Sequence, residues 1–130
     1  MNSPYVYDAG ALIAIGNNDR RMWTRHNLAL AERRDILVPS IVVSQAWRDT
    51  RRQVMLGKFL AGCHVVPVGL ETAKAAGILC GKARTADIVD ATVVVVAASF
   101  RAVVWTSDPD DIRALVDAQD VKPAPGVRVV

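Results

Sequence analysis

The chain has 130 residues, which is the length of one globular domain, and we treat residues 1–130 as a single domain. Hydrophobic residues make up 52% of it and charged residues 22%, a balance that excludes intrinsic disorder as the main state. The formal net charge is only +3, so the net charge alone favours no class of partner.

The sequence also disfavours a membrane protein and an exported protein. The longest apolar run, residues 91–98, falls far short of the ~20 residues of a membrane-spanning helix. The first residues contain no basic segment followed by a long apolar one, as a signal peptide would. The two cysteines, Cys63 and Cys80, form no CxxC motif, and we expect two thiols in a cytoplasmic protein, although the spacing does not exclude a disulfide.

Hydrophobic runs alternate with helical patterns along the chain, and the order of the predicted elements is β-α-α-β-α-β-α-α-β-α-β. The predicted elements in chain order are a strand at 5–7, helices at 9–15 and 20–34, a strand at 36–38, a helix from 40 to 54, a strand at 64–68, helices at 70–83 and 87–100, a strand at 103–105, a helix at 110–118 and a strand at 127–130. This alternation predicts an α/β fold with a five-stranded, mostly parallel sheet covered on both faces.

The predicted helices at 40–54 and 87–100 depend on residue spacing and on segment length, respectively. In the helix that begins at Ser40, one apolar face is predicted from the spacing of Val43, Ala46, Trp47, Thr50 and Val54. A second face would then carry Gln45, Arg48, Asp49 and Arg52. The segment 87–100 is rich in valine, which favours strands, but roughly fourteen residues without a turn signal exceed most strands. We therefore predict a buried helix there.

Charge is distributed unevenly along the chain. Residues 19–58 hold nine basic and four acidic side chains, whereas residues 87–120 hold seven aspartates and two arginines. Such a division suits a polyanion held by arginines beside a divalent cation held by carboxylates, although ordinary solvated helix faces would produce it too.

Aspartates recur where the predicted strands end. Asp8 follows the first strand, Asp87 and Asp90 open the predicted buried helix, and Asp108 and Asp111 follow the fourth strand. Each of them alone could cap a helix. Because the carboxyl ends of parallel strands meet at one edge of the sheet, the group together predicts an acidic pocket that holds a cation, for which Mg²⁺ or Mn²⁺ has the suitable chemistry.

Four segments resemble the motifs of PIN-domain nucleases. They are Val6-Tyr-Asp8-Ala-Gly-Ala-Leu12, the stretch from Val38 to Arg48, Val89-Asp90-Ala-Thr followed by the valines up to Ala97, and Thr106-Ser-Asp108-Pro-Asp-Asp-Ile112. The length and the motif order resemble VapC-type toxins of type II toxin–antitoxin modules, over nearly the whole chain. The resemblance implies a three-layer α/β/α PIN-like fold.

The resemblance also implies a site. Asp8, Asp90 and Asp108 match the family's metal-binding acids, with Asp87 and Asp111 as further candidates. The family usually has glutamate where this chain has Gln45, a neutral amide that cannot offset the charge of a metal. Asp49, one turn later on the predicted helix, could compensate.

The implied function is Mg²⁺- or Mn²⁺-dependent cleavage of RNA by a metal-activated water. In that scheme Arg48, Arg51 and Arg52 hold flanking phosphates, an antitoxin protein covers the acidic pocket, and the chain forms a homodimer. Gln45 motivates a second hypothesis, a catalytically weakened PIN-like module that binds RNA or protein.

A third hypothesis is a phosphoacceptor receiver domain, which also has a parallel sheet and acidic strand ends. It is disfavoured because the third strand ends in Pro67-Val-Gly69, with no aspartate to phosphorylate.

Overall fold

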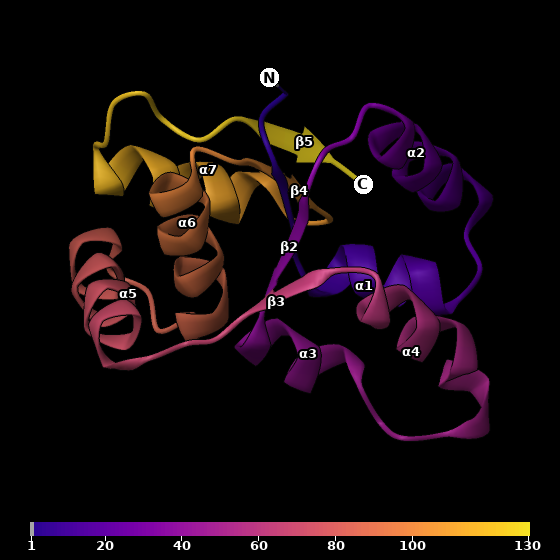
Figure 1. The fold of residues 1–130 in the computed structure, drawn as a ribbon. Coiled ribbons are helices and arrows are strands. Elements are labelled where there is room, and N and C mark those ends of the chain that lie inside the picture. Colours follow the sequence, from indigo (N-terminus) through magenta and orange to yellow (C-terminus); the bar gives the residue numbers. More distant parts are fainter. Residues whose placement is uncertain (1) are drawn as a thin grey trace.

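Five short strands form one sheet in the computed structural model, which describes residues 2–130 (Figure 1). The strands are β1 (Tyr5–Tyr7), β2 (Ile36–Pro39), β3 (His64–Val66), β4 (Val103–Thr106) and β5 (Val127–Val129). Their order in the sheet is β3-β2-β1-β4-β5, and every pair is parallel. The predicted α/β architecture with five strands is confirmed, and the sheet is parallel throughout.

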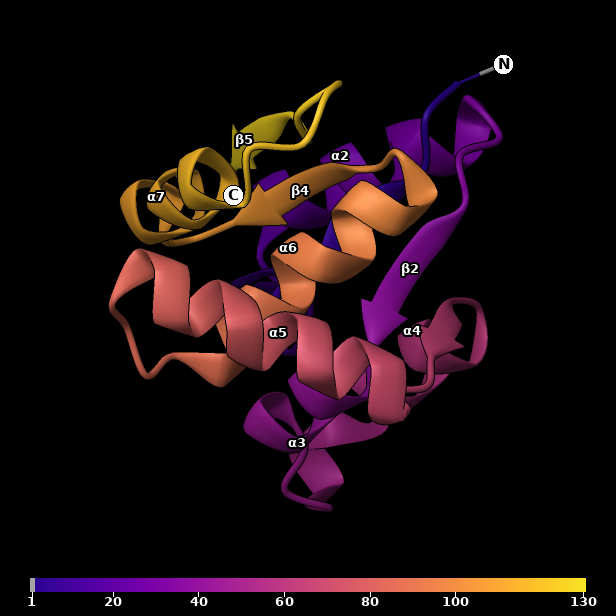
Figure 2. The ribbon, with the colours of Figure 1, turned by 90° about the vertical axis from the view of Figure 1, so that its left-hand side faces the viewer.

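The sheet separates two groups of helices, as the three-layer prediction requires. The helices are α1 (Ala9–Gly16), α2 (Arg20–Ala31), α3 (Ser40–Ala46), α4 (Val54–Ala61), α5 (Leu70–Ala83), α6 (Ile88–Phe100) and α7 (Pro109–Gln119). Figure 1 shows α5, α6 and α7 on one side of the sheet and α1, α2 and α4 on the other. Helix α5 packs against α6 and α7 rather than on the sheet itself, and lies foremost in Figure 2.

Strand alternation divides the core between these two layers. In β1, Val6 is fully buried, and its neighbour Tyr7 points to the opposite face, where its ring stacks on Phe59 of α4 at 5.9 Å. The Tyr7 hydroxyl lies 3.2 Å from Nδ1 of His26 in α2. The strand directly preceding Asp8 is therefore fixed on both faces.

Helix α6 confirms the prediction of a buried helix at 87–100. All seven residues from Ala91 to Ala97 are buried, because the helix lies between the sheet on one side and α5 and α7 on the other. A helix that is buried all round needs no polar face, which explains the uninterrupted valines. Its confinement also fixes the position of its N-terminus, at which Asp87 and Asp90 lie.

The prediction of one helix from Ser40 to Val54 is wrong. Helix α3 ends at Ala46, because Trp47 adopts an extended backbone and Asp49 a left-handed one with φ of 55°. A 3₁₀ turn at Arg51–Gln53 then leads into α4. The side chain of Gln53 replaces the missing helical hydrogen bonds: its Nε2 donates to the Ala46 carbonyl at 2.7 Å, and its Oε1 accepts from the Arg48 amide at 2.6 Å. The two predicted faces of that helix therefore do not exist.

Replacing Gln53 by alanine is expected to lower the free energy of unfolding by about 1–2 kcal/mol, because the Ala46 carbonyl and the Arg48 amide would both lose their partner. Urea unfolding measures the change. Gln45→Ala is the matched control, since Gln45 is exposed on α3, and its effect is expected to stay within about 0.5 kcal/mol. Equal stability of the two variants would contradict a capping role for Gln53.

The remaining differences from the predicted elements are small. The helix predicted to reach Arg34 ends at Ala31, shortly before Arg33 takes a left-handed backbone with φ of 58°. Cys63 and Cys80 are both free thiols. Within residues 2–130, no helix has the length and apolar character needed to cross a membrane.

Candidate metal centre

The first acid of the site, Asp8, lies directly after β1 and is only 5% exposed. Its Oδ1 accepts a hydrogen bond from the Ala11 amide at 3.0 Å and so caps α1. Burial raises the pKa of its carboxyl, while hydrogen bonds from the Thr106 hydroxyl and from the amides of Ala11, Ser107 and Gly10 act in the opposite direction. The carboxyl of Asp8 is thus held in one orientation by hydrogen-bond donors from the start of α1 and from the end of β4 with the loop that follows it.

Gly10 makes this close approach of the two segments possible. A Cβ atom at this position would lie 2.5 Å from Cβ of Ser107 and 3.2 Å from Oδ1 of Asp8. The first of these distances is shorter than any normal contact, so only glycine lets the first turn of α1 pack against the loop that follows β4.

The second and third acids open α6. The Oδ1 atom of Asp87 accepts a hydrogen bond from the Asp90 amide at 3.1 Å, so Asp87 caps the helix as its sequence context allowed. Asp90 follows in the first turn and is partly buried.

The last two acids open α7, and here the capping alternative does not hold. Asp108 occupies the N-cap position, followed by Pro109, yet its side chain makes no capping hydrogen bond. Its amide donates to the Thr106 hydroxyl oxygen at 2.9 Å, which orients the turn. The carboxylate of Asp108 is therefore free of a structural role in the helix it precedes, while Asp111 lies in the first turn.

These acids meet around Asp90. Carboxylate oxygens of Asp87, Asp90 and Asp111 lie within 4.8 Å of one another. The three side chains line a hollow of about 190 Å³ between the ends of α5, α6 and α7. Burial, followed by the hydrogen bond and charge of Asp87 and by the charges of Asp8 and Asp108, raises the pKa of Asp90 to about 7. The pKa of Asp111 is also raised, chiefly by its hydrogen bond with Asp108.

Among residues 2–130, no basic side chain forms an ion pair with this group. In the part of the chain that the structure describes, the two ion pairs are Arg34–Glu32 and His64–Asp35, and neither involves the five aspartates. Uncompensated carboxylates at such spacing repel one another unless a cation joins them. The donor set consists of hard oxygens, and ligand oxygens around Mg²⁺ lie ~2.0–2.1 Å from the ion, so small side-chain movements would bring the cluster to that geometry. The residues fit Mg²⁺ or Mn²⁺.

The raised pKa of Asp90 predicts how metal-free stability depends on pH. Its pKa is about 7 in the folded chain against 3.8 in the unfolded one, so the folded state binds this proton more tightly. The contribution to stability is complete below about pH 4 and is lost as the pH rises through about 7. Over that pH range we expect the free energy of unfolding of wild type to fall by about 1–2 kcal/mol relative to that of Asp90→Asn. This value is smaller than the full pKa shift would give, because the carboxyl is partly solvated.

Urea unfolding in EDTA at several pH values measures this difference. The His26 ring, whose pKa burial lowers, cancels because both proteins contain it. A difference that does not change with pH would contradict the electrostatic account of the cluster.

The predicted second-acid position is Gln45, which is exposed on α3. Like Asp8 and Asp108, it does not line the hollow formed by Asp87, Asp90 and Asp111. The prediction that Asp49 shares a helix face with Gln45 is wrong, because the helix ends at Ala46, before Asp49. Arg48 and Arg52 line a different hollow, next to α1, whereas Arg51 is exposed and does not line it.

Thr106, which joins Asp8 to the Asp108 turn and is fully buried, was not predicted as part of the site. The available signal was a hydroxyl residue at the end of a strand, directly before an aspartate turn. The contact of Gly10 with Ser107 and the capping of α3 by Gln53 were not predicted either.

Comparison with known proteins identifies the fold. The chain superimposes on a chain of VapBC2 from Rickettsia felis, whose crystal structure contains a DNA fragment from the VapBC2 promoter. The TM-score is 0.72 and the sequence identity 16%, and the match covers 97% of this chain and 98% of that chain. It also matches a chain of DNA-bound VapBC from Salmonella typhimurium, with a TM-score of 0.69 and 15% identity over 98% of both chains.

No family model matches the sequence, and no curated protein matches it significantly. The shared fold over the full length agrees with the three-layer PIN-like architecture that the four motifs predicted, which is thereby confirmed.

Proposed function

We propose that this protein is a VapC-type toxin, an endoribonuclease that depends on Mg²⁺ or Mn²⁺ and is neutralised by a cognate antitoxin protein. The observation that carries the proposal is the convergence of four other aspartates on Asp90, with no ion pair to a basic side chain among residues 2–130. The fold shared with chains of two VapBC structures supports the toxin–antitoxin assignment. By the same resemblance we propose a cytoplasmic homodimer.

In this proposal Asp8, Asp90 and Asp108 hold the metal, and Asp87 and Asp111 complete its surroundings. A bound divalent ion of this kind lowers the pKa of a water molecule and stabilises negative charge that develops on a phosphate. The buried carboxyl of Asp8 is kept in place by its hydrogen bonds, so that it is positioned before a metal binds.

The substrate-binding side chains proposed here come from the segment after α3. Arg48, Arg51 and Arg52 have no carboxylate within ion-pair distance among residues 2–130, so their charges are available to phosphates of an RNA backbone.

A second candidate function rests on Gln45. If the amide leaves the metal too weakly held, the chain is a PIN-like module that binds RNA or protein and no longer cuts. The chain offers five carboxylates in the cluster around Asp90 without Gln45, and this number of acidic ligands favours tolerance of the amide and hence the nuclease.

A cleavage assay on structured RNA with Mg²⁺, with Mn²⁺ and with EDTA tests the proposal. Wild type and Asp8→Asn are compared, both shown to be folded by thermal unfolding. Cleavage that needs both the cation and Asp8 is the expected result. A folded wild type that binds RNA but does not cut it under any of these conditions would favour the binding module.

A further inference from the structure

A second hollow lies beside α1, outside the acidic cluster. It has a volume of about 320 Å³, at the lower end of the range for small-molecule sites. Its apolar part includes the exposed side chain of Ile13 together with the buried Leu12 and Leu56. Its polar part includes Asn17, Thr50, Arg48 and Arg52. An apolar floor with a basic rim fits a flat aromatic group that carries a phosphate.

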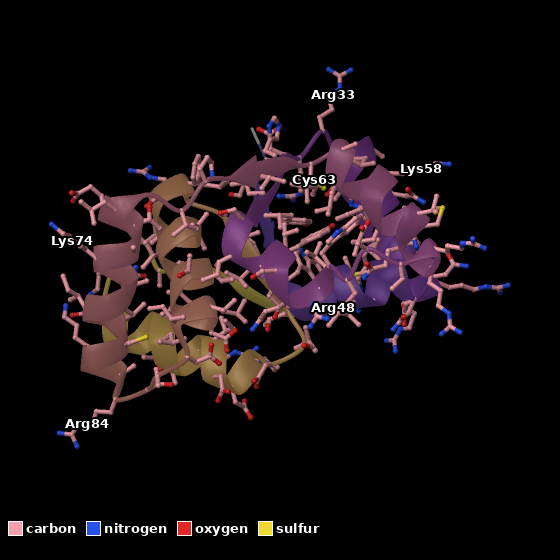
Figure 3. The ribbon with its side chains drawn as sticks, turned by 90° about the horizontal axis from the view of Figure 1, so that it is seen from below. Arg33, Arg48, Lys58, Cys63, Lys74 and Arg84 are labelled. Carbon is pink, nitrogen blue, oxygen red and sulfur yellow. The ribbon has the colours of Figure 1, made fainter. Side chains whose placement is uncertain are left out.

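The two arginines differ in how they are held. Nη1 of Arg48 donates to the carbonyls of Ser44 at 3.1 Å and Trp47 at 2.7 Å, which fixes the guanidinium beside the end of α3. Figure 3 views this underside of the molecule, with Arg48 at the end of α3 and Lys58 projecting outward from α4. Neither arginine has a carboxylate partner among residues 2–130. The rim therefore presents uncompensated positive charge to an anion.

Helix α1 joins this hollow to the acidic cluster. Asp8 caps its N-terminus, and Leu12, Ile13 and Gly16 of the same helix line the hollow. At a rise of about 1.5 Å per residue, Asp8 lies about 6–12 Å along the helix axis from the residues of α1 that line the hollow. That separation corresponds to about one or two nucleotides of an extended single strand.

We propose that the hollow receives one unstacked nucleobase of the RNA substrate, with the adjoining phosphate on Arg52 and Arg48. This inference rests on the proposed ribonuclease function and adds a determinant of sequence preference to it. Proteins that read RNA sequence bind bases splayed out of the stack, with apolar contact to the ring and hydrogen bonds to its edge. Asn17 and Thr50 offer those hydrogen bonds here.

Binding of a short fluorescein-labelled RNA in EDTA, measured by anisotropy, tests the phosphate contact. Arg52→Gln is expected to weaken binding about ten-fold and to reduce its salt dependence by about one counterion, since Arg52 is exposed and its loss leaves the fold intact. Lys58→Gln on α4 removes the same charge outside the hollow, and a weakening of two-fold or less is expected. An equal effect of the two variants would overturn the inference in favour of a diffuse basic surface.

An abasic scan of the same RNA tests the base contact. Removing one base is expected to weaken wild-type binding about ten-fold at a single position near the cleavage site, and Asn17→Ala is expected to reduce the preference for the base at that position. If the loss of a base weakens binding equally little at every position, the inference is overturned. Mg²⁺-dependent cleavage by wild type would then still support the proposed function.

Two further outcomes also overturn the inference. In the first, wild type binds a synthetic peptide of alternating glutamate and leucine, and Arg52→Gln loses that binding but binds RNA as well as wild type does. This result would show that the hollow takes a protein segment. Absence of both cleavage and RNA binding in wild type would remove the proposed function and the inference together.

Discussion

Replacing Asp90 by asparagine is expected to reduce metal-dependent RNA cleavage by about a thousandfold or more. Asp90 is the residue on which the charges of Asp87, Asp8 and Asp108 all act, so it lies at the centre of the proposed cation site. Its amide replacement keeps the shape and removes the negative charge. Initial cleavage rates at saturating Mg²⁺ measure the effect.

The matched control for this substitution is Asp117→Asn. Asp117 is an exposed aspartate of α7, the helix that also carries Asp111, and it is not part of the acidic cluster. We expect its cleavage rate to stay within about two-fold of wild type. Because Asp90→Asn also removes repulsion, it should unfold at a temperature at or above that of wild type near pH 8. Near-normal cleavage by a folded Asp90→Asn protein would contradict the assignment.

Replacing Gly10 by alanine is expected to destabilise the protein by about 2–3 kcal/mol. The new Cβ would collide with Cβ of Ser107, an atom fixed to its backbone, so α1 and the loop after β4 would have to separate. Thermal or urea unfolding measures the loss. Because the same contact sets Asp8 against Thr106, cleavage should fall as well.

Two further variants isolate this steric cause. Ser107→Gly removes Cβ and Oγ of Ser107, the two atoms with which the added Cβ would collide. In the double variant it should restore most of the stability. Gly77→Ala is the matched control in α5, since nothing lies within 4 Å of its added Cβ, and it is expected to stabilise by about 0.5–1 kcal/mol through helix propensity. Destabilisation of the same size at both glycines would contradict the proposed contact.

The fold could largely be predicted because its signals are local. Short β-branched runs mark the strands, and the length of the segment 87–100 correctly outweighed the strand propensity of its valines. The end of α3 could not be predicted in this way. It depends on the side chain of Gln53 returning to Ala46, a contact between positions that the helical pattern itself does not distinguish.

The candidate site was predicted as a group of residues but not as an arrangement. The resemblance put Asp8, Asp90 and Asp108 first and Asp87 and Asp111 as further candidates, whereas the carboxylate oxygens that lie within 4.8 Å of one another belong to Asp87, Asp90 and Asp111. Which oxygens approach depends on how α6 and α7 pack, and on Asp8 being turned toward the Ala11 amide. Tertiary contacts of this kind leave no trace in sequence spacing.

The same limit applies to the basic segment. Sequence placed Arg48, Arg51 and Arg52 together as phosphate-binding candidates, whereas the turn at Arg51–Gln53 directs Arg48 and Arg52 to the hollow beside α1. The turn exists because α3 ends at Ala46. The same early end therefore explains why the helix boundary was predicted wrongly and why Arg51 does not lie with Arg48 and Arg52.

The proposed function requires that the acidic cluster around Asp90 bind a divalent cation. An anomalous difference map from crystals grown with Mn²⁺ would locate such an ion. We expect one or two strong peaks within coordination distance of Asp90 and of at least one of Asp8, Asp108, Asp87 and Asp111. A map at saturating Mn²⁺ with no peak at this cluster, while its aspartates keep the arrangement described above, would contradict the proposed function.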